Sequence, residues 1–161
     1  MIEIDEEKGE VTVGGKRFFF PAVELMNATR KRLKGIGAPA ARFMYEAGKE
    51  AGRVYAEGVV EVVGEVDSAD EYVEVSERFG AITGWGMLDV VERDYERMVF
   101  KVEVRNTIFD SDEDEKTCCY TAGMLAGSAE RILGSEMDCK EIECVNESED
   151  NDKCVVSCLP V

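Results

Sequence analysis

The six cysteines of the chain are the residues with the clearest capacity for chemistry, and all of them lie within residues 118–161. Thiolates are preferred ligands of zinc, and a tetrahedral zinc site needs about four ligands. The sequence contains no histidine, so a transition-metal site would have to use cysteine, carboxylate, backbone or water ligands. It also contains no C-x-x-C pair, which excludes the ordinary zinc-ribbon pattern. From the cysteines alone, metal ligands, buried thiols and disulfides all remain open, although a reducing compartment favours the first two.

Other catalytic patterns are absent from the sequence. Histidine, the commonest general base, is missing, and no nucleophile lies beside a base in a recognisable pattern. Neither a phosphate-binding loop nor a dinucleotide fingerprint occurs. The acidic segment Asp110–Glu115 resembles the opening of a calcium loop, but the turn glycine and the closing glutamate are missing. These absences favour a binding protein over an enzyme.

Length and composition indicate one globular domain over residues 1–161. Hydrophobic residues make up 45 % of the chain and charged residues 34 %, a composition typical of folded proteins. The net charge of −16 argues against nucleic acid as a partner, because lysine and arginine must neutralise phosphates. The acidic start Met1–Asp5 does not resemble a signal peptide, and no apolar run approaches the roughly 18 residues of a membrane span. We therefore expect a cytoplasmic protein.

The first half of the chain predicts a hairpin followed by helices. Residues 2–20 alternate as two strands around a Gly14–Gly15 turn, and Pro21 suits the first position of a helix to about Lys34. A second helix is expected over 38–57. Its Gly48 and Gly52 are four residues apart, which lets another backbone approach closely, either inside the fold or across a dimer.

The second half predicts one more amphipathic helix, then strands around a glycine-bearing helix. Asp67 or Ser68 can cap the third helix, whose apolar face has a 3-4-3 spacing at Tyr72, Val75, Phe79 and Ile82. The remaining expected elements are strands over 87–91 and 98–104, a helix over 118–133, and strands over 139–145 and 154–158. This order predicts an α+β fold, with helices packed on an antiparallel sheet.

The segment between Cys118 and Cys154 resembles the signature of the 4-vinyl reductase domain family. The matching positions are Cys118, Gly123, Gly127, Gly134, Glu141, Cys144 and Cys154, with weaker matches at Tyr45, Gly48, Gly52 and the run Gly84-Trp85-Gly86. That family includes the sensory domain of phenol-responsive transcription activators and a protein implicated in bacteriochlorophyll synthesis. Its fold is similar to TRAPP subunits and to nitric-oxide sensor domains, so the resemblance implies that fold here.

The resemblance also implies one structural zinc per chain, held by Cys118, Glu141, Cys144 and Cys154. The register leaves Cys158 as an alternative to Cys154 for the last ligand. On a regular strand, Glu141 and Cys144 would point to opposite faces. The strand must therefore end or turn near Glu143 if both are to reach one ion.

By the same resemblance we expect a small-molecule binding or sensor domain for a small hydrophobic ligand, in a chain that forms a homodimer. The expected pocket residues are Trp85, Tyr120, Met124 and Cys139. The phenol sensors carry a pocket histidine that this chain lacks, so phenol specificity and transcriptional output are not implied. Two alternatives stand beside this interpretation: a reductase or accessory protein of tetrapyrrole metabolism, and a TRAPP-like assembly subunit.

Overall fold

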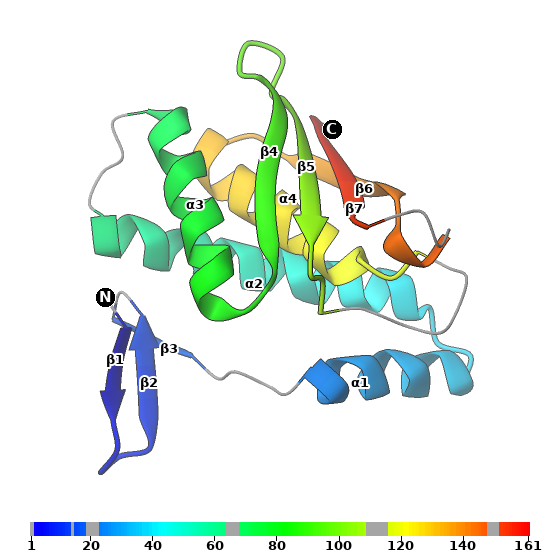
Figure 1. Ribbon diagram of the computed structural model, residues 1–161, viewed down its shortest axis with the longest axis horizontal. Helices are drawn as coiled ribbons and strands as arrows, with labels where there is room; N and C mark the ends of the chain where they lie inside the picture. The colour runs from blue at the N-terminus through cyan, green and yellow to red at the C-terminus, as the bar shows by residue number, and fades with distance from the viewer. Residues whose placement is uncertain (1, 14, 19–22, 64–67, 109–115, 148–151) are drawn as a thin grey trace.

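The structure, a computed structural model, describes residues 2–13, 15–18, 23–63, 68–108, 116–147 and 152–161. Two antiparallel sheets and four α-helices make up this part of the chain (Figure 1). The elements in order are β1 (Ile2–Asp5), β2 (Glu10–Val13), β3 (Lys16–Phe18), α1 (Val23–Gly35), α2 (Ala40–Val63), α3 (Ala69–Thr83), β4 (Met87–Asp94), β5 (Val99–Arg105), α4 (Cys119–Leu133), β6 (Met137–Glu143), a short 3-10 helix (Val145–Glu147) and β7 (Cys154–Pro160). The predicted α+β class is confirmed.

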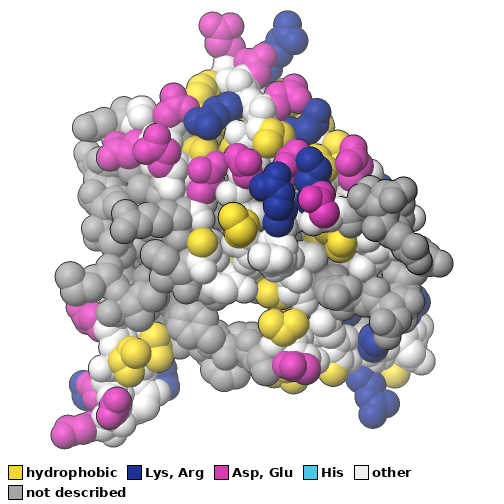
Figure 2. Space-filling view, in the orientation of Figure 1, with side chains coloured by type: hydrophobic (Ala, Val, Ile, Leu, Met, Phe, Trp, Pro, Cys, Tyr) yellow, Lys and Arg dark blue, Asp and Glu magenta, His cyan; other side chains and the backbone are white. Residues whose placement is uncertain are grey.

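The four-stranded sheet has the order β4-β5-β7-β6, with every neighbouring pair antiparallel. Alternation along β5 places Phe100, Val102 and Val104 in the core, where each is at most 9 % exposed. The other face of β5 carries charged side chains that pair across the strands, including Lys101 with Glu92. Figure 2 shows acidic and basic side chains gathered over β4 and β5. The sheet therefore has one buried and one solvated face.

Helix α4 lies against the buried face of this sheet, and α2 packs on α4. Glycines on both helices make the approach possible. A Cβ atom at Gly52 would overlap the backbone of Met124, and one at Gly127 would overlap the backbone of Lys49. Gly48 and Gly123 are equally crowded by backbone atoms of the facing helix. Of the two roles predicted for the Gly48/Gly52 pair, packing inside the fold is confirmed.

A cluster of polar contacts fixes α2 and α4 to β6. Lys49 and Arg53 of α2 form ion pairs with Glu130 of α4, at N–O distances of 2.6 and 2.7 Å. Glu130 Oε1 also accepts a hydrogen bond from the backbone N–H of Met137. The hydroxyl of Tyr45 accepts from the Cys139 backbone N–H, and burial raises the pKa of this tyrosine to about 12. Tyr45 is therefore neutral and hydrogen-bonded at physiological pH.

The N-terminal strands form a sheet of their own, of order β1-β2-β3, which stands apart from the other elements in Figure 1. The predicted hairpin is present as β2 and β3, and β1 adds a strand that was not expected. Pro21 lies outside the described residues. Helix α2 extends to Val63, six residues beyond its predicted end, because Ala56 and Val59 are fully buried there.

Helix α3 begins as predicted. The hydroxyl of Ser68 accepts a hydrogen bond from the backbone N–H of Glu71 at 3.1 Å, which caps the first turn. Gly84 ends the helix in the left-handed conformation, with φ of 76°. The predicted apolar face of Tyr72, Val75, Phe79 and Ile82 lies outside the described side chains.

Candidate metal centre and neighbouring cavity

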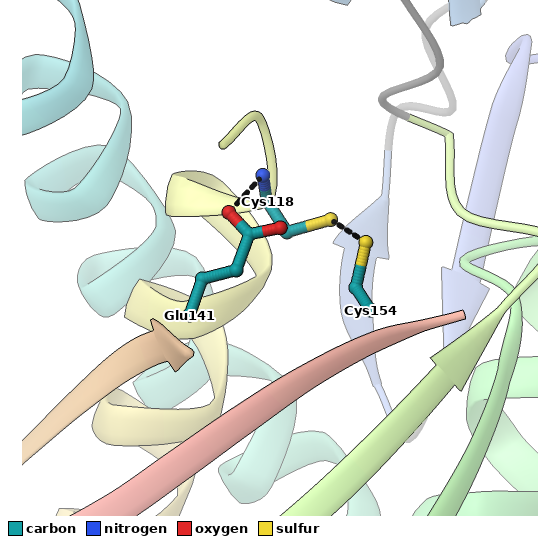
Figure 3. A group of neighbouring side chains, drawn as sticks. All are labelled: Cys118, Glu141 and Cys154. Carbon is teal, nitrogen blue, oxygen red and sulfur yellow. Dashed lines mark hydrogen bonds between the residues drawn. The ribbon is translucent and has the colours of Figure 1, made fainter. Parts of the chain in front are cut away.

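Three side chains from three different elements meet at one end of the four-stranded sheet. Cys118 precedes the first residue of α4, Glu141 lies on β6, and Cys154 opens β7 (Figure 3). Their ligand atoms all lie within 4.8 Å of one another. The Sγ atoms of Cys118 and Cys154 are 3.1 Å apart, and both residues are fully buried. The cluster is therefore a compact group of potential metal ligands.

Cys144 joins this group through its sulfur, which lies 3.8 Å from Sγ of Cys154. Its approach depends on the end of β6. The register of β6 against β7 shifts between Glu141 and Glu143, the strand ends there, and a 3-10 turn follows from Val145. The predicted turn near Glu143 is confirmed. All four residues expected as metal ligands are thus brought together.

Glu141 has one carboxylate oxygen in use and one without a partner. Its Oε2 accepts a hydrogen bond of 2.9 Å from the backbone N–H of Cys118. Its Oε1 is buried and has no hydrogen-bond partner among the described residues. A buried oxygen in this state is costly unless something binds it. A cation beside Oε1 would remove that cost.

The thiols around Glu141 perturb one another strongly. Hydrogen bonds to Cys144 and Cys154, together with burial, raise the pKa of Cys118. The interaction with Cys118 lowers the pKa of Cys144 to about 4. Burial raises the pKa of Glu141 to about 7. Protons are therefore shared among the sulfur and oxygen atoms of this group, and one divalent cation would displace those protons on binding.

Hydrogen-bond donors also surround the sulfur atoms. The backbone N–H of Val145 donates to Sγ of Cys154 at 3.4 Å, and the hydroxyl of Thr107 lies 3.3 Å from Sγ of Cys118. Such contacts orient ligands and stabilise thiolates around a metal. Three sulfur atoms, one carboxylate oxygen and these outer contacts fit the donor set of a zinc site.

The other two cysteines of the sheet form a disulfide, which the sequence did not single out. Cys139 of β6 and Cys158 of β7 are directly opposite in the antiparallel register, with Cα atoms 4.0 Å apart. This register removes Cys158 from the ligand group, so that Cys154 is the cysteine beside Cys118. Cys119 is in no disulfide, is partly exposed and lies outside the group.

An apolar cavity of about 100 Å³ lies beside the disulfide, between α3, the buried sheet face and α4. Val73 comes from α3, Val102 from β5, Leu125 from α4 and Cys158 from β7. A dry apolar cavity of about 150 Å³ binds benzene, so a small widening of this cavity would admit a molecule of that size. The fold therefore provides an apolar binding space lined by α4 and β7, the two elements at whose starts Cys118 and Cys154 lie.

The four predicted pocket residues fall into two groups. Met124 lines the cavity, and Cys139 is bonded to the lining residue Cys158. Trp85 and Tyr120 stack on each other, with ring centroids 5.1 Å apart, and are not among the residues that line this cavity. The lining residues of α3 and the sheet could not be identified from the sequence, because their apolar spacing is that of any core.

Among the described helices, none is long and apolar enough to cross a membrane. No protein-family model matches the sequence, and no curated protein matches it.

Comparison with solved structures identifies similar folds. The phenol-responsive sensory domain of the transcription activator PoxR, solved with phenol, is similar with a TM-score of 0.84 and 17 % identity, over 99 % of this chain and 84 % of that one. A vinyl-4-reductase family protein from Methanocaldococcus jannaschii gives a TM-score of 0.56 and 22 % identity, over 91 % and 83 % of the two chains.

A third similar structure is a trafficking protein particle complex subunit 3 from Naegleria fowleri, covalently bound to palmitic acid. Its TM-score is 0.62 at 10 % identity, and the match covers 86 % of this chain and 95 % of that one. At these identities the likeness concerns the fold. The chain thus shares the fold of a phenol-sensing domain, a vinyl-4-reductase family protein and a TRAPP subunit.

Proposed function

We propose that this chain is a binding domain for a small hydrophobic molecule, braced by a zinc ion at Cys118, Glu141, Cys144 and Cys154. The apolar cavity between α3, the sheet and α4 is the observation that carries the proposal. The similar domain of PoxR was solved with phenol, and the similar trafficking subunit carries palmitic acid. Both proteins therefore hold a largely apolar molecule on this fold, which supports a binding role here.

The proposed zinc has a structural role. Cys118 enters from the start of α4, Glu141 and Cys144 from the end of β6, and Cys154 from the start of β7. A metal held by all four would join the helix to two strands, and later residues of α4 and β7 line the cavity. Four protein ligands leave no open position for water or substrate. The zinc thus stabilises the frame of the cavity and does not react with its contents.

Filling the cavity tests the binding role. Ala129 of α4 lines the cavity, and Ala129→Leu would occupy part of its volume. We expect toluene or phenol to raise the Tm of the wild-type protein by roughly 5 °C at concentrations far above Kd. The Ala129→Leu protein should show at most a fraction of this rise, measured by differential scanning fluorimetry.

The matched control is Ala81→Leu, at an exposed position of α3 outside the cavity lining. This variant should respond to ligand like the wild type. If neither toluene nor phenol shifts the wild-type Tm, the cavity does not bind compact apolar molecules and the proposed function fails.

We further propose that the chain forms a homodimer through α1 and α2. These helices expose large apolar side chains: Leu25 is 51 % exposed, Phe43 53 % and Val54 46 %. Exposed apolar surface of this kind favours association. Light scattering behind a sizing column should give about twice the chain mass of 17.9 kDa. A mass equal to one chain at all concentrations would refute the dimer.

A further inference from the structure

We propose that Ser76 orients the ligand in the cavity, and that the ligand is a compact apolar molecule carrying one hydroxyl group. This inference rests on the proposed binding function and deepens it. Ser76 lies on α3 and is one of the residues that line the cavity. Among the described lining residues, it is the one whose side-chain hydroxyl makes no hydrogen bond.

The hydroxyl of Ser76 is buried and has no hydrogen-bond partner among the described residues. Buried polar groups are almost always paired, because an unpaired one forfeits the hydrogen bonds that water supplies in the unfolded chain. A serine in a helix interior usually resolves this by bonding to the carbonyl one turn earlier. Since Ser76 does not, its hydroxyl remains available to a group inside the cavity.

Every other oxygen-bearing side chain among the described lining residues is already engaged. The hydroxyl of Tyr55 donates to the Ser76 carbonyl at 3.1 Å, and the hydroxyl of Ser128 donates to the Gly52 carbonyl at 3.0 Å. Glu77 Oε1 accepts from the Val90 N–H at 2.9 Å, and the Tyr95 hydroxyl donates to Asp70 at 2.6 Å. The three hydroxyl groups have committed their one hydrogen, so they could only accept a hydrogen bond from a ligand, as the Glu77 carboxylate could. Among the described lining residues, Ser76 therefore has the one hydroxyl whose hydrogen is uncommitted, so it can both donate to and accept from a ligand.

This arrangement sets the chemical class of the ligand. A hydroxyl group both donates and accepts, so it can pair with Ser76 in either sense. Ser76 has a single side-chain torsion, and its Oγ can turn toward the cavity without a backbone movement. A carboxylate is disfavoured, because no lysine or arginine is among the described lining residues and Glu77 is. A second hydroxyl could only donate, for example to the Glu77 carboxylate, and would find no uncommitted donor among the described lining residues.

The experiment is a cycle of two ligands and two proteins. Phenol and toluene have nearly the same shape and differ by one hydroxyl, and Ser76→Ala removes the proposed partner. Calorimetry should show that Ser76→Ala weakens phenol binding about 10-fold or more, while toluene binding changes less than about 2-fold. The variant should fold at least as well as the wild type, because alanine removes an unpaired hydroxyl and favours the helix.

Ser128→Ala is the matched control, since Ser128 lies in the same wall but is already bonded to Gly52. This control should change phenol and toluene affinity by the same factor. If Ser76→Ala leaves the phenol-to-toluene ratio unchanged while both ligands bind, the role of Ser76 is overturned and the binding function stands. If neither ligand binds to the wild type, both the role of Ser76 and the binding function fail.

Discussion

Replacing Gly52 by alanine is expected to destabilise the protein by roughly 3–5 kcal/mol, a large share of the stability of a domain this size. The added Cβ atom would overlap the carbonyl oxygen and the Cα atom of Met124 on the facing helix. These are backbone atoms, so no side-chain rotation relieves the overlap, and α2 and α4 must move apart. Such a movement would open the centre of the core, where α4 packs on the sheet. Urea unfolding of the variant and the wild type measures the difference.

Gly35→Ala provides the control for this experiment. Gly35 is the last residue of α1, and a Cβ atom there meets nothing within 4 Å. Its variant should remain within about 0.5 kcal/mol of the wild type, because alanine also reduces the entropy of the unfolded chain. A Gly52→Ala protein as stable as the Gly35→Ala protein would show that the α2–α4 interface tolerates a wider separation.

Local signals allowed much of the fold to be predicted. Ser68 has the side-chain hydroxyl that an N-cap position favours. Gly84 and Gly134 end their helices in the left-handed conformation that glycine favours. Alternation placed Phe100 on the buried face of β5, although Met98 precedes the strand with φ of 54°. Gly58 directly follows the predicted end of α2 and has a low helix propensity, yet the helix continues through it to Val63. Burial of Val59 in the tertiary structure outweighs that local preference.

The sequence predicted only those residues of the candidate site whose spacing along the chain matched a pattern of metal ligands. Cys118, Glu141, Cys144 and Cys154 were named from the resemblance and lie together in the structure. The Cys139–Cys158 pair was not named, because it depends on the register between β6 and β7. A tight turn can fix register, but β6 and β7 are joined by a long connection between Glu143 and Cys154, so the sequence contains no such signal here. Ser76 was missed for a similar reason, since its significance lies in the absence of a partner, which only the packed structure reveals.

Loss of zinc together with loss of stability is the expected result of Cys118→Ala. Protein purified without added metal should contain about one zinc per chain, and the variant little or none, by elemental analysis. Cys118 is fully buried and is within reach of both Glu141 and Cys154, so its removal breaks the centre of the ligand group. At free zinc about 1,000 times Kd, the bound metal contributes roughly 4 kcal/mol of stability. The variant should therefore unfold at a correspondingly lower urea concentration.

Cys119→Ala separates the metal effect from a general effect of cysteine removal, because Cys119 is the next residue and lies outside the ligand group. It should keep its zinc.

Cys144→Ala then decides whether the metal centre is closed or open. If Cys144 is the fourth ligand, its loss also releases zinc, as a closed structural site requires. If zinc stays bound to Cys118, Glu141 and Cys154 alone, the metal has an open position for water, and an enzymatic role becomes the better explanation. If the wild type contains no zinc and its four thiols titrate as free, the metal proposal fails while the cavity remains to be tested by its own ligands.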